Sequence, residues 1–197
     1  MLIQIKNRWN DSIIFEGDFD CLASAIIEAV RKNAYLASAN LAGAYLAGAN
    51  LAGANLGGAN LGGANLAGAK GVNKYLTTDL YMLYDQPGLI RAYKLINADG
   101  EGNYSRNNGH TPIKYEIGGA YEVPDANTDE REQCASGINL CTLPWAIREW
   151  REGYRVLMAE HTAADIAAIP IGSDGKYRVH RCKIVGEKYL KELGLAE

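Results

Sequence analysis

The sequence predicts a short β-solenoid joined to a small α+β domain, and three observations lead to this fold class. Leucine recurs at every fifth residue from Leu36 to Leu66. The run from Ala34 to Ala69 contains no Asp, Glu, Lys or Arg. Beyond residue 88, charged residues return and short apolar runs alternate with polar turns. Two regions of such different composition indicate two different folds in one chain.

The composition narrows the class of function. The 197 residues carry 20 Lys and Arg against 23 Asp and Glu, which gives a net charge of −3. Proteins that bind nucleic acid need a basic surface to neutralise phosphates, so direct binding to nucleic acid is not expected. Four cysteines without dense spacing do not form a disulfide scaffold. No secretion signal or membrane span is predicted, so we expect a cytoplasmic protein with reduced thiols and no membrane partner.

The five-residue repeat of residues 34–71 excludes the two regular secondary structures. Five residues turn an α-helix by about 500°, so leucines at this period form no apolar stripe. An odd period in a straight strand places successive leucines on opposite faces. The backbone must therefore turn a corner in every unit, with Leu and the Ala two residues before it pointing inward and Asn or Tyr pointing outward. The predicted inward positions are Leu36, Leu41, Leu46, Leu51, Leu56, Leu61 and Leu66, with Ala34, Ala39, Ala44, Ala49, Ala54, Ala59 and Ala64.

This unit resembles the pentapeptide-repeat family, whose repeat is a small residue, Asp or Asn, Leu or Phe, and two further residues that often end in Gly. The resemblance extends over residues 34–71. It implies a right-handed, four-sided β-helix with about four units per coil, and hence about two coils here.

A solenoid this short needs caps, because its open coil ends would otherwise pair with other strands. The N-terminal segment predicts a hairpin around the polar turn Asn10-Asp11. An amphipathic helix follows, for which Asp18 or Asp20 is the predicted N-cap. A Tyr-rich apolar stretch that ends at Pro87-Gly88 predicts a closing segment and junction. The predicted regions are therefore the cap 1–33, the repeats 34–71, the closing segment 72–88 and the α+β domain 89–197.

The C-terminal region predicts a mixture of strands and helices. A helix is expected after Thr142, with Pro144 in its first turn and an inward stripe of Leu143, Ala146, Ile147 and Trp150. The predicted strands are Ile90–Ile96, Ile113–Ile117, Ala120–Val123, Ile138–Thr142, Tyr154–Glu160 and Tyr177–Val185, with further helices at Ala163–Ile169 and Lys188–Leu193.

Two features resemble phage proteins. A hairpin and helix leading directly into pentapeptide repeats are similar to the layout of some phage proteins. The segments Tyr115–Glu122 and Cys134–Pro144 resemble an uncharacterised phage-associated domain with the pattern Cys-x-x-Gly-Phe-His-x-Cys. Ile138 and Asn139 stand here in place of the Phe and His of that pattern. The resemblance implies a viral protein of phage or prophage origin, active in the cytoplasm of the bacterial host.

A candidate partner-binding surface lies on the helix that follows Thr142. Trp145 projects opposite the predicted inward stripe, among charged residues, and Trp ringed by charges is typical of interaction hot spots. The alternative is that another element of the fold covers the indole. The candidate residues are Trp145, Arg148, Glu149 and Glu152.

The sequence supports metal binding and catalysis less than it supports protein binding. The candidate zinc ligands Cys134, Cys141, His180 and Cys182 are spaced C-x6-C and H-x-C. Structural zinc sites use the tighter C-x2–4-C pairing, so core packing is the preferred interpretation. None of the three histidines lies in a recognisable catalytic motif. No metal, cofactor or catalytic residue is predicted.

The functional hypothesis is a non-enzymatic protein-binding module, in which a rigid β-helix presents the α+β domain to a host or phage protein, with counter-defence as one role. A homodimer through the β-helix or its caps is a further expectation. One alternative is an enzyme, because Gly137–Leu140 and the following helix resemble the core of ADP-ribosyltransferases. Another is a DNA-mimic inhibitor, which the uncharged repeats disfavour.

Overall fold

The chain divides into two compact units, each of which is described by itself. The computed structural model describes residues 1–52, 54–56, 59–61, 64, 66, 70–102, 112–132 and 135–195. The first unit comprises Met1–Asp79 with two short later segments, one of which is Pro170–Asp174. The second unit takes most of the chain from Leu80 onward. The predicted junction 72–88 is thus split between the units, and Pro170–Asp174 leaves the domain to which we assigned it.

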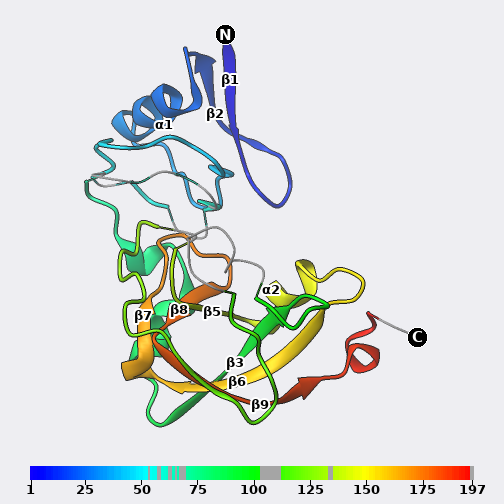
Figure 1. Cartoon of the computed structure of the whole chain (residues 1–197). Helices are drawn as coiled ribbons and strands as arrows, with labels where there is room; N and C mark the ends of the chain where they lie inside the picture. Colours follow the sequence, from blue (N-terminus) through cyan, green and yellow to red (C-terminus); the bar gives the residue numbers. More distant parts are fainter. Residues whose placement is uncertain are drawn as a thin grey trace. The chain divides into compact units, whose positions relative to one another are not determined.

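The first unit begins with the predicted hairpin (Figure 1). Strand β1 (Leu2–Lys6) pairs antiparallel with β2 (Ile13–Asp18), and Ile5 lies opposite Phe15. Alternate residues face inward, so Ile5 is fully buried while Leu2 is exposed. The hairpin therefore has one apolar face for packing and one face in solvent.

Helix α1 (Leu22–Arg31) follows, but its N-cap differs from the prediction. Asp18 is the last residue of β2, where it pairs with Leu2, and the helix begins only after Cys21. Ser24 supplies the capping contacts, because its Oγ accepts from the Cys21 amide at 3.3 Å and donates to the Cys21 carbonyl at 2.8 Å. A short polar side chain within the first turn thus replaces the predicted carboxylate.

The repeats turn a corner in every unit through one recurrent hydrogen bond. The amide of Ala44 donates to the carbonyl of Leu41 at 3.2 Å, and the same bond recurs in later units. It closes a four-residue turn whose third residue has a positive φ, +70° at Gly43. A turn of this type needs glycine or a similarly tolerant residue at that place, which explains the Gly or Ser that closes each unit.

Successive coils pair in parallel at a separation of twenty residues. Asn40 and Asn60 form a parallel bridge, and so do Asn50 and Lys70. The Leu41 amide donates to the Asn60 carbonyl at 2.8 Å, which is an inter-coil bond. Twenty residues correspond to four units of five, so one coil consists of four units. The seven leucines are at most 2% exposed and share one core with the hairpin and α1.

Both ends of the repeat core are covered within the first unit. At the N-terminal side the Asn40 amide donates to the Lys6 carbonyl at 2.7 Å, so the end of β1 continues onto the first coil. Ile171 packs against the same core, and the amide of Gly172 donates to Thr77 Oγ1 at 3.0 Å. A segment about a hundred residues downstream therefore serves as part of the cap. Local sequence patterns do not predict such a contact.

The second unit is a seven-stranded antiparallel sheet, counted over the described residues, rather than the predicted α+β mixture. Its order is β4-β9-β6-β3-β5-β8-β7, and Figure 1 shows β3, β6 and β9 side by side. The described part contains a single short α-helix, α2 (Leu143–Arg148). The strands are β3 (Leu89–Ile96), β4 (Ala120–Glu122), β5 (Ile138–Cys141), β6 (Arg155–Thr162), β7 (Ile166–Ala168), β8 (Lys176–Val179) and β9 (Arg181–Lys188).

Three predicted elements of this unit are wrong. The expected helix Ala163–Ile169 is a single 3-10 turn, Ala163–Asp165, followed by β7, because the chain pairs with β8 at once. The expected strand Tyr177–Val185 is two strands that break at His180. The expected strand Ile113–Ile117 makes only an isolated bridge, from Lys114 to Glu101. Further 3-10 turns among the described residues are Lys74–Leu76 of the first unit, Asp79–Asp85 at the boundary between the units and Leu190–Leu193 near the C-terminal end.

The sheet buries apolar side chains on both faces. Along β3, Ile90, Ala92 and Ile96 join one cluster, whereas Leu95 joins another that includes α2. This alternation is what a strand with two covered faces requires. No helix among the described residues is long and apolar enough to cross a membrane.

Candidate functional site

The first candidate site is an exposed tryptophan in the turn of the N-terminal hairpin. The Trp9 side chain is 75% exposed, although tryptophan is a large apolar residue. The guanidinium carbon of Arg8 lies 4.6 Å from the centroid of the indole ring. A cation over an aromatic face is an attractive contact, so the two side chains present one combined surface. We call residues 7–12 the Trp9 loop.

The Trp9 loop is held in place by backbone hydrogen bonds. The Trp9 amide donates to Asn7 Oδ1 at 2.8 Å, and the Asn7 amide donates to the Ser12 carbonyl at 2.8 Å. The Arg8 amide donates to the Ser38 carbonyl of the first repeat unit at 2.9 Å. A loop that is ordered before binding loses less conformational entropy in a complex.

Exposed tyrosines add to the surface of the repeats. Tyr35 and Tyr45 are each 69% exposed, and both occupy the outward position of their unit. Because one coil takes twenty residues, the two tyrosines lie half a coil apart and face different sides.

The second unit has its own candidate site, a cleft of about 340 Å³ beside β4, β9 and the end of β6. Its charged lining comprises Glu122, Glu160, Asp165, Arg181 and Lys183. Glu160 is paired with Arg91, which lies opposite it on β3. Acidic and basic groups are thus mixed, and the cleft presents no single dominant charge.

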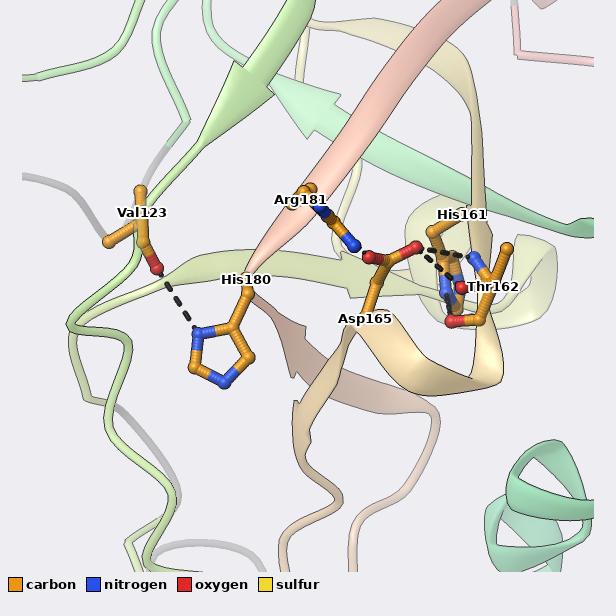
Figure 2. A network of polar contacts seen from close by, with 6 residues as sticks. All are labelled: Val123, His161, Thr162, Asp165, His180 and Arg181. Carbon is orange, nitrogen blue, oxygen red and sulfur yellow. Dashed lines mark hydrogen bonds and ion pairs between the residues drawn. The ribbon is translucent and has the colours of Figure 1, made fainter.

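Asp165, one of the charged groups of this cleft, accepts hydrogen bonds from Thr162 and Arg181 (Figure 2). Its Oδ2 accepts from the Thr162 amide at 2.8 Å and from Thr162 Oγ1 at 2.7 Å. Its Oδ1 accepts from Arg181 Nε at 2.6 Å. Burial raises the pKa of Asp165, but the bonds from Thr162 and Arg181 outweigh it and leave the pKa below its usual value.

Both ring nitrogens of His161 are engaged. Nδ1 lies 2.8 Å from the Thr162 carbonyl and Nε2 lies 2.7 Å from the Tyr177 hydroxyl. Because a carbonyl can only accept, Nδ1 carries the proton and Nε2 accepts from Tyr177. Burial lowers the pKa of His161, which favours this neutral form. His180 is separate from this pair, with its Nδ1 3.3 Å from the Val123 carbonyl (Figure 2).

Two thiols and two phenol groups of the second unit are buried in environments that keep them protonated. Burial raises the pKa of the Cys141 thiol to about 12 and that of Cys182 to about 11. Burial also raises the pKa of Tyr115 and Tyr177. A thiol must ionise to attack, so neither of these two thiols is activated.

The structure places the predicted repeat positions in the interior of the first unit. All seven leucines are buried, as are Ala39, Ala44, Ala49, Ala59 and Ala64. Ala34 and Ala54 are half-buried and pack against the same core.

Trp145 is covered rather than exposed, which agrees with the alternative given in the sequence analysis and not with the candidate hot spot. Its side chain is only 7% exposed and packs with Leu95, Ala146 and Val156. α2 has six residues and begins at Thr142, whose Oγ1 accepts from the Trp145 amide at 3.4 Å. In so short a helix the sheet surface decides which face is covered, and here it covers Trp145 as well as Ala146. The remaining residues of that candidate patch, Arg148, Glu149 and Glu152, are at least partly exposed without the indole at their centre.

The candidate zinc ligands do not form a group in the described structure. Cys141 Sγ donates to the Tyr93 carbonyl at 3.3 Å, and Cys182 packs in the other apolar cluster of the sheet. No group of three or more His, Cys, Asp or Glu side chains able to hold a metal is found among the described residues. Cys134 and His110 lie outside the residues that the structure describes.

Sequence reasoning missed Trp9. The signal was present, since the stretch Arg8-Trp9-Asn10-Asp11 places a tryptophan in a predicted polar turn. A turn between two short strands has no interior to bury an indole, so exposure could have been inferred.

Comparisons with known proteins identify one region. Residues 32–70 match the family model of pentapeptide repeats, in eight copies. This confirms that the chain contains pentapeptide repeats, with nearly the bounds that were predicted. Neither the curated proteins nor the solved structures contain a match to this chain. The likeness of the cap and the C-terminal region to phage proteins stays a prediction.

Proposed function

We propose that this chain is a protein-binding scaffold, in which the pentapeptide repeats rigidly present the Trp9 loop to a partner protein. The main support for this proposal is the Trp9 side chain, which is 75% exposed and lies against the guanidinium of Arg8. Hydrogen bonds within the loop and to the first repeat unit hold this pair in place. Trp and Arg are, together with Tyr, the residues most enriched at energetic hot spots. An ordered loop on a repeat scaffold is a good platform for such a pair.

The scaffold itself is proposed to be a right-handed, four-sided β-helix of about two coils. The parallel bridges at twenty-residue spacing and the turn in each unit support four sides per coil. The hairpin and α1 support a cap at the first coil, because they share its apolar core.

The proposed partner is a host or phage protein in the bacterial cytoplasm, with an apolar pocket for the indole and carboxylates around it for Arg8. The charge-free run from Ala34 to Ala69 supports this choice over a DNA mimic, which needs rows of acidic groups. The cleft of the second unit is a further surface for recognition, and we propose no catalytic role for it. Engaged nitrogens on His161 and the raised pKa of both buried thiols support a non-enzymatic function.

The test compares two matched aromatic variants of the full chain. Tyr75 is a good control for Trp9, because it is 68% exposed, has Lys74 Nζ 5.5 Å from its ring and donates its amide to Asn73 Oδ1 at 3.2 Å. Tagged wild type, Trp9→Ala and Tyr75→Ala are used to capture proteins from a bacterial lysate. The captured protein is then purified, and its Kd is measured against all three forms.

The proposal is supported if one partner binds Trp9→Ala at least tenfold more weakly than wild type, which is the loss typical of a hot spot. The same partner should bind Tyr75→Ala less than threefold more weakly than wild type. Equal affinity for all three forms would remove the Trp9 loop from the proposal. The partner could instead be a second copy of this chain, and light scattering on the purified protein tests this alternative. A wild-type dimer that becomes a monomer with Trp9→Ala would identify the partner as a second copy. Modification of a target with NAD, in the absence of a stable complex, would contradict the scaffold.

A further inference from the structure

The turn between β7 and β8 belongs to the first unit, although both of its strands belong to the second. β7 ends at Ala168 and β8 begins at Lys176, and the two strands pair antiparallel. The segment Pro170–Asp174 between them is part of the compact unit that contains the repeats. A turn between paired strands usually lies on the surface, yet Gly172 and Ser173 are buried. We call Pro170–Asp174 the β7–β8 turn.

The β7–β8 turn lies close against the repeat core. Ile171 packs against the apolar side chains of this core. A Cβ added to Gly172 would lie 2.5 Å from Leu61 Cβ, which leaves no room for a side chain. Gly172 has a positive φ of +71°, and the Ser173 amide donates to the Pro170 carbonyl at 2.9 Å. Glycine therefore allows both the tight turn and the close approach to a repeat leucine.

A buried hydrogen bond holds the tip of the turn. The Gly172 amide donates to Thr77 Oγ1 at 3.0 Å, and Thr77 Oγ1 donates to the Lys74 carbonyl at 2.6 Å. Thr77 is only 4% exposed, so these bonds are shielded from water. The turn is thus held in the first unit by directional bonds as well as by apolar packing.

The pairing of β7 with β8 prepares the turn for this contact. Ala168 lies opposite Arg178, so the two ends of the turn are held close together. A free segment would lose conformational entropy when its ends are brought together, and strand pairing has already removed that entropy. Among the described strands, however, β7 is a three-residue edge strand that pairs with β8 alone. It has few contacts to break, so it opens at a lower free energy than the centre of the sheet.

We propose that the β7–β8 turn is a latch that couples the stability of the repeats to the edge of the sheet. While β7 and β8 are paired, the turn keeps its closed form and holds Leu61 and Thr77. When β7 separates from β8, the turn loses this form, its contacts with the repeats are lost and the leucine core opens to solvent. A strand of a partner protein that displaces β7 therefore loosens the repeats. The inference is independent of which protein binds the Trp9 loop.

The alternative is a passive contact, in which the turn covers repeats that are equally stable without it. Hydrogen exchange of the backbone amides between the coils distinguishes the two cases, because these amides exchange when the repeats open. Four such amides donate to carbonyls of a neighbouring coil at 2.8–2.9 Å, namely those of Leu41, Leu51, Asn60 and Lys70. Their exchange is followed in the full chain by ¹H–¹⁵N NMR, while the amides of β3 and β6 report on the centre of the sheet.

The first comparison tests the contact of the latch with the repeats. Gly172→Ala places a methyl group 2.5 Å from Leu61 Cβ, whereas Gly194→Ala, at a similar φ of +67°, meets nothing within 4 Å. Gly172→Ala should speed the exchange of the four inter-coil amides at least tenfold, and Gly194→Ala less than twofold. If Gly172→Ala does not fold, Thr77→Val, which removes the acceptor of the Gly172 amide, should act in the same direction.

The second comparison tests the coupling to the edge of the sheet. Val179 of β8 lies opposite Ile166 of β7, whereas Val156 lies on β6 inside the sheet, and both valines are fully buried. Val179→Ala and Val156→Ala remove the same two methyl groups, but separation of β7 from β8 disturbs only the surroundings of Val179. We expect Val179→Ala to speed inter-coil exchange at least fivefold and Val156→Ala less than twofold. Ile166→Val, a smaller change in the same strand pair, serves if Val179→Ala does not fold.

Three results would overturn the latch. Inter-coil exchange that is the same in wild type, Gly172→Ala and Thr77→Val would show that the turn does not hold the repeats. Unchanged exchange in Val179→Ala would show that the repeats are independent of the β7–β8 pair. Equal acceleration by Val179→Ala and Val156→Ala, together with faster exchange in β3 and β6, would show that the repeats open only when the whole sheet unfolds.

Discussion

The two units of this protein differ most in what they bury. The repeat core consists of leucine and alanine at regular positions. The second unit also buries titratable side chains from its strands and from the turn before β7, namely Lys94, His161, Asp165, Lys176 and Arg178. The first interior depends on volume and on the exact path of the backbone, whereas the second depends on hydrogen bonds and charge. Their stabilities should therefore respond to different perturbations.

The largest effect is expected from a cavity in the repeat core. Leu51 is fully buried, and its amide bonds to the Lys70 carbonyl of the next coil at 2.8 Å. Leu51→Ala leaves the backbone bond and removes the side chain, so it should destabilise the first unit by about 2–5 kcal/mol. Urea unfolding followed by circular dichroism measures the change. Tyr45→Ala, at an exposed outward position, should change stability by less than about 0.5 kcal/mol. Similar losses for both variants would contradict a closed apolar core.

The next effect tests the path of the backbone in the same unit. Gly43 and Gly71 both have positive φ, +70° and +76°. A Cβ at Gly43 meets nothing within 4 Å, whereas one at Gly71 would lie 2.2 Å from Ala52 Cα. Gly43→Ala should therefore lower the free energy of unfolding by about 1–2 kcal/mol, the cost of placing a side chain on a residue with positive φ. Gly71→Ala should cost about 1–3 kcal/mol more, because the coils must move apart. Equal thermal shifts for the two variants would show that this inter-coil contact is absent.

The smallest effect belongs to the second unit and depends on pH. Asp165→Asn keeps the shape of the side chain but loses the charge that binds Thr162 and Arg181, so it should cost about 1–2 kcal/mol near pH 7. The pKa of Asp165 is below its ordinary value of 3.8 in the folded chain, so its contribution is full above that value. It is lost as the pH falls through the folded pKa.

Urea unfolding of wild type and Asp165→Asn over a pH series measures this contribution. The difference between them should be constant from pH 7 to about 5 and should shrink below about 4. The titration of His161, whose pKa is also lowered, occurs in both chains and largely cancels in the difference. A difference that does not change with pH would show that the Asp165 charge contributes no stability.

Sequence reasoning worked best where one local rule decides the structure. The hairpin, α1 and the strand β3 follow from side-chain periodicity, and the helix after Thr142 follows from its capping residue. It failed where pairing with a distant strand overrode the local pattern. The segment Ala163–Ile169 has a composition that permits a helix, yet β8 recruits Ile166–Ala168 into the sheet.

The candidate sites were less predictable than the fold. Exposure of a tryptophan depends on what covers it, and the covering element can come from anywhere in the chain. Trp145 is covered by the sheet and by neighbours such as Lys176, whose Nζ lies 5.8 Å from its ring centroid. Trp9 occupies a turn with no such cover. Helical periodicity places Trp145 opposite the inward stripe of its helix, but it cannot tell whether another part of the fold covers that face.

The sequence alone determined that residues 34–71 coil at a five-residue period, because no helix or straight strand can bury leucines at that spacing. Only the tertiary structure decided which indole is exposed, which lysines are buried and that a segment near residue 171 joins the cap of the repeats. The physical reason is range: turn formation and side-chain periodicity act between neighbours in sequence, whereas burial and charge compensation act between neighbours in space.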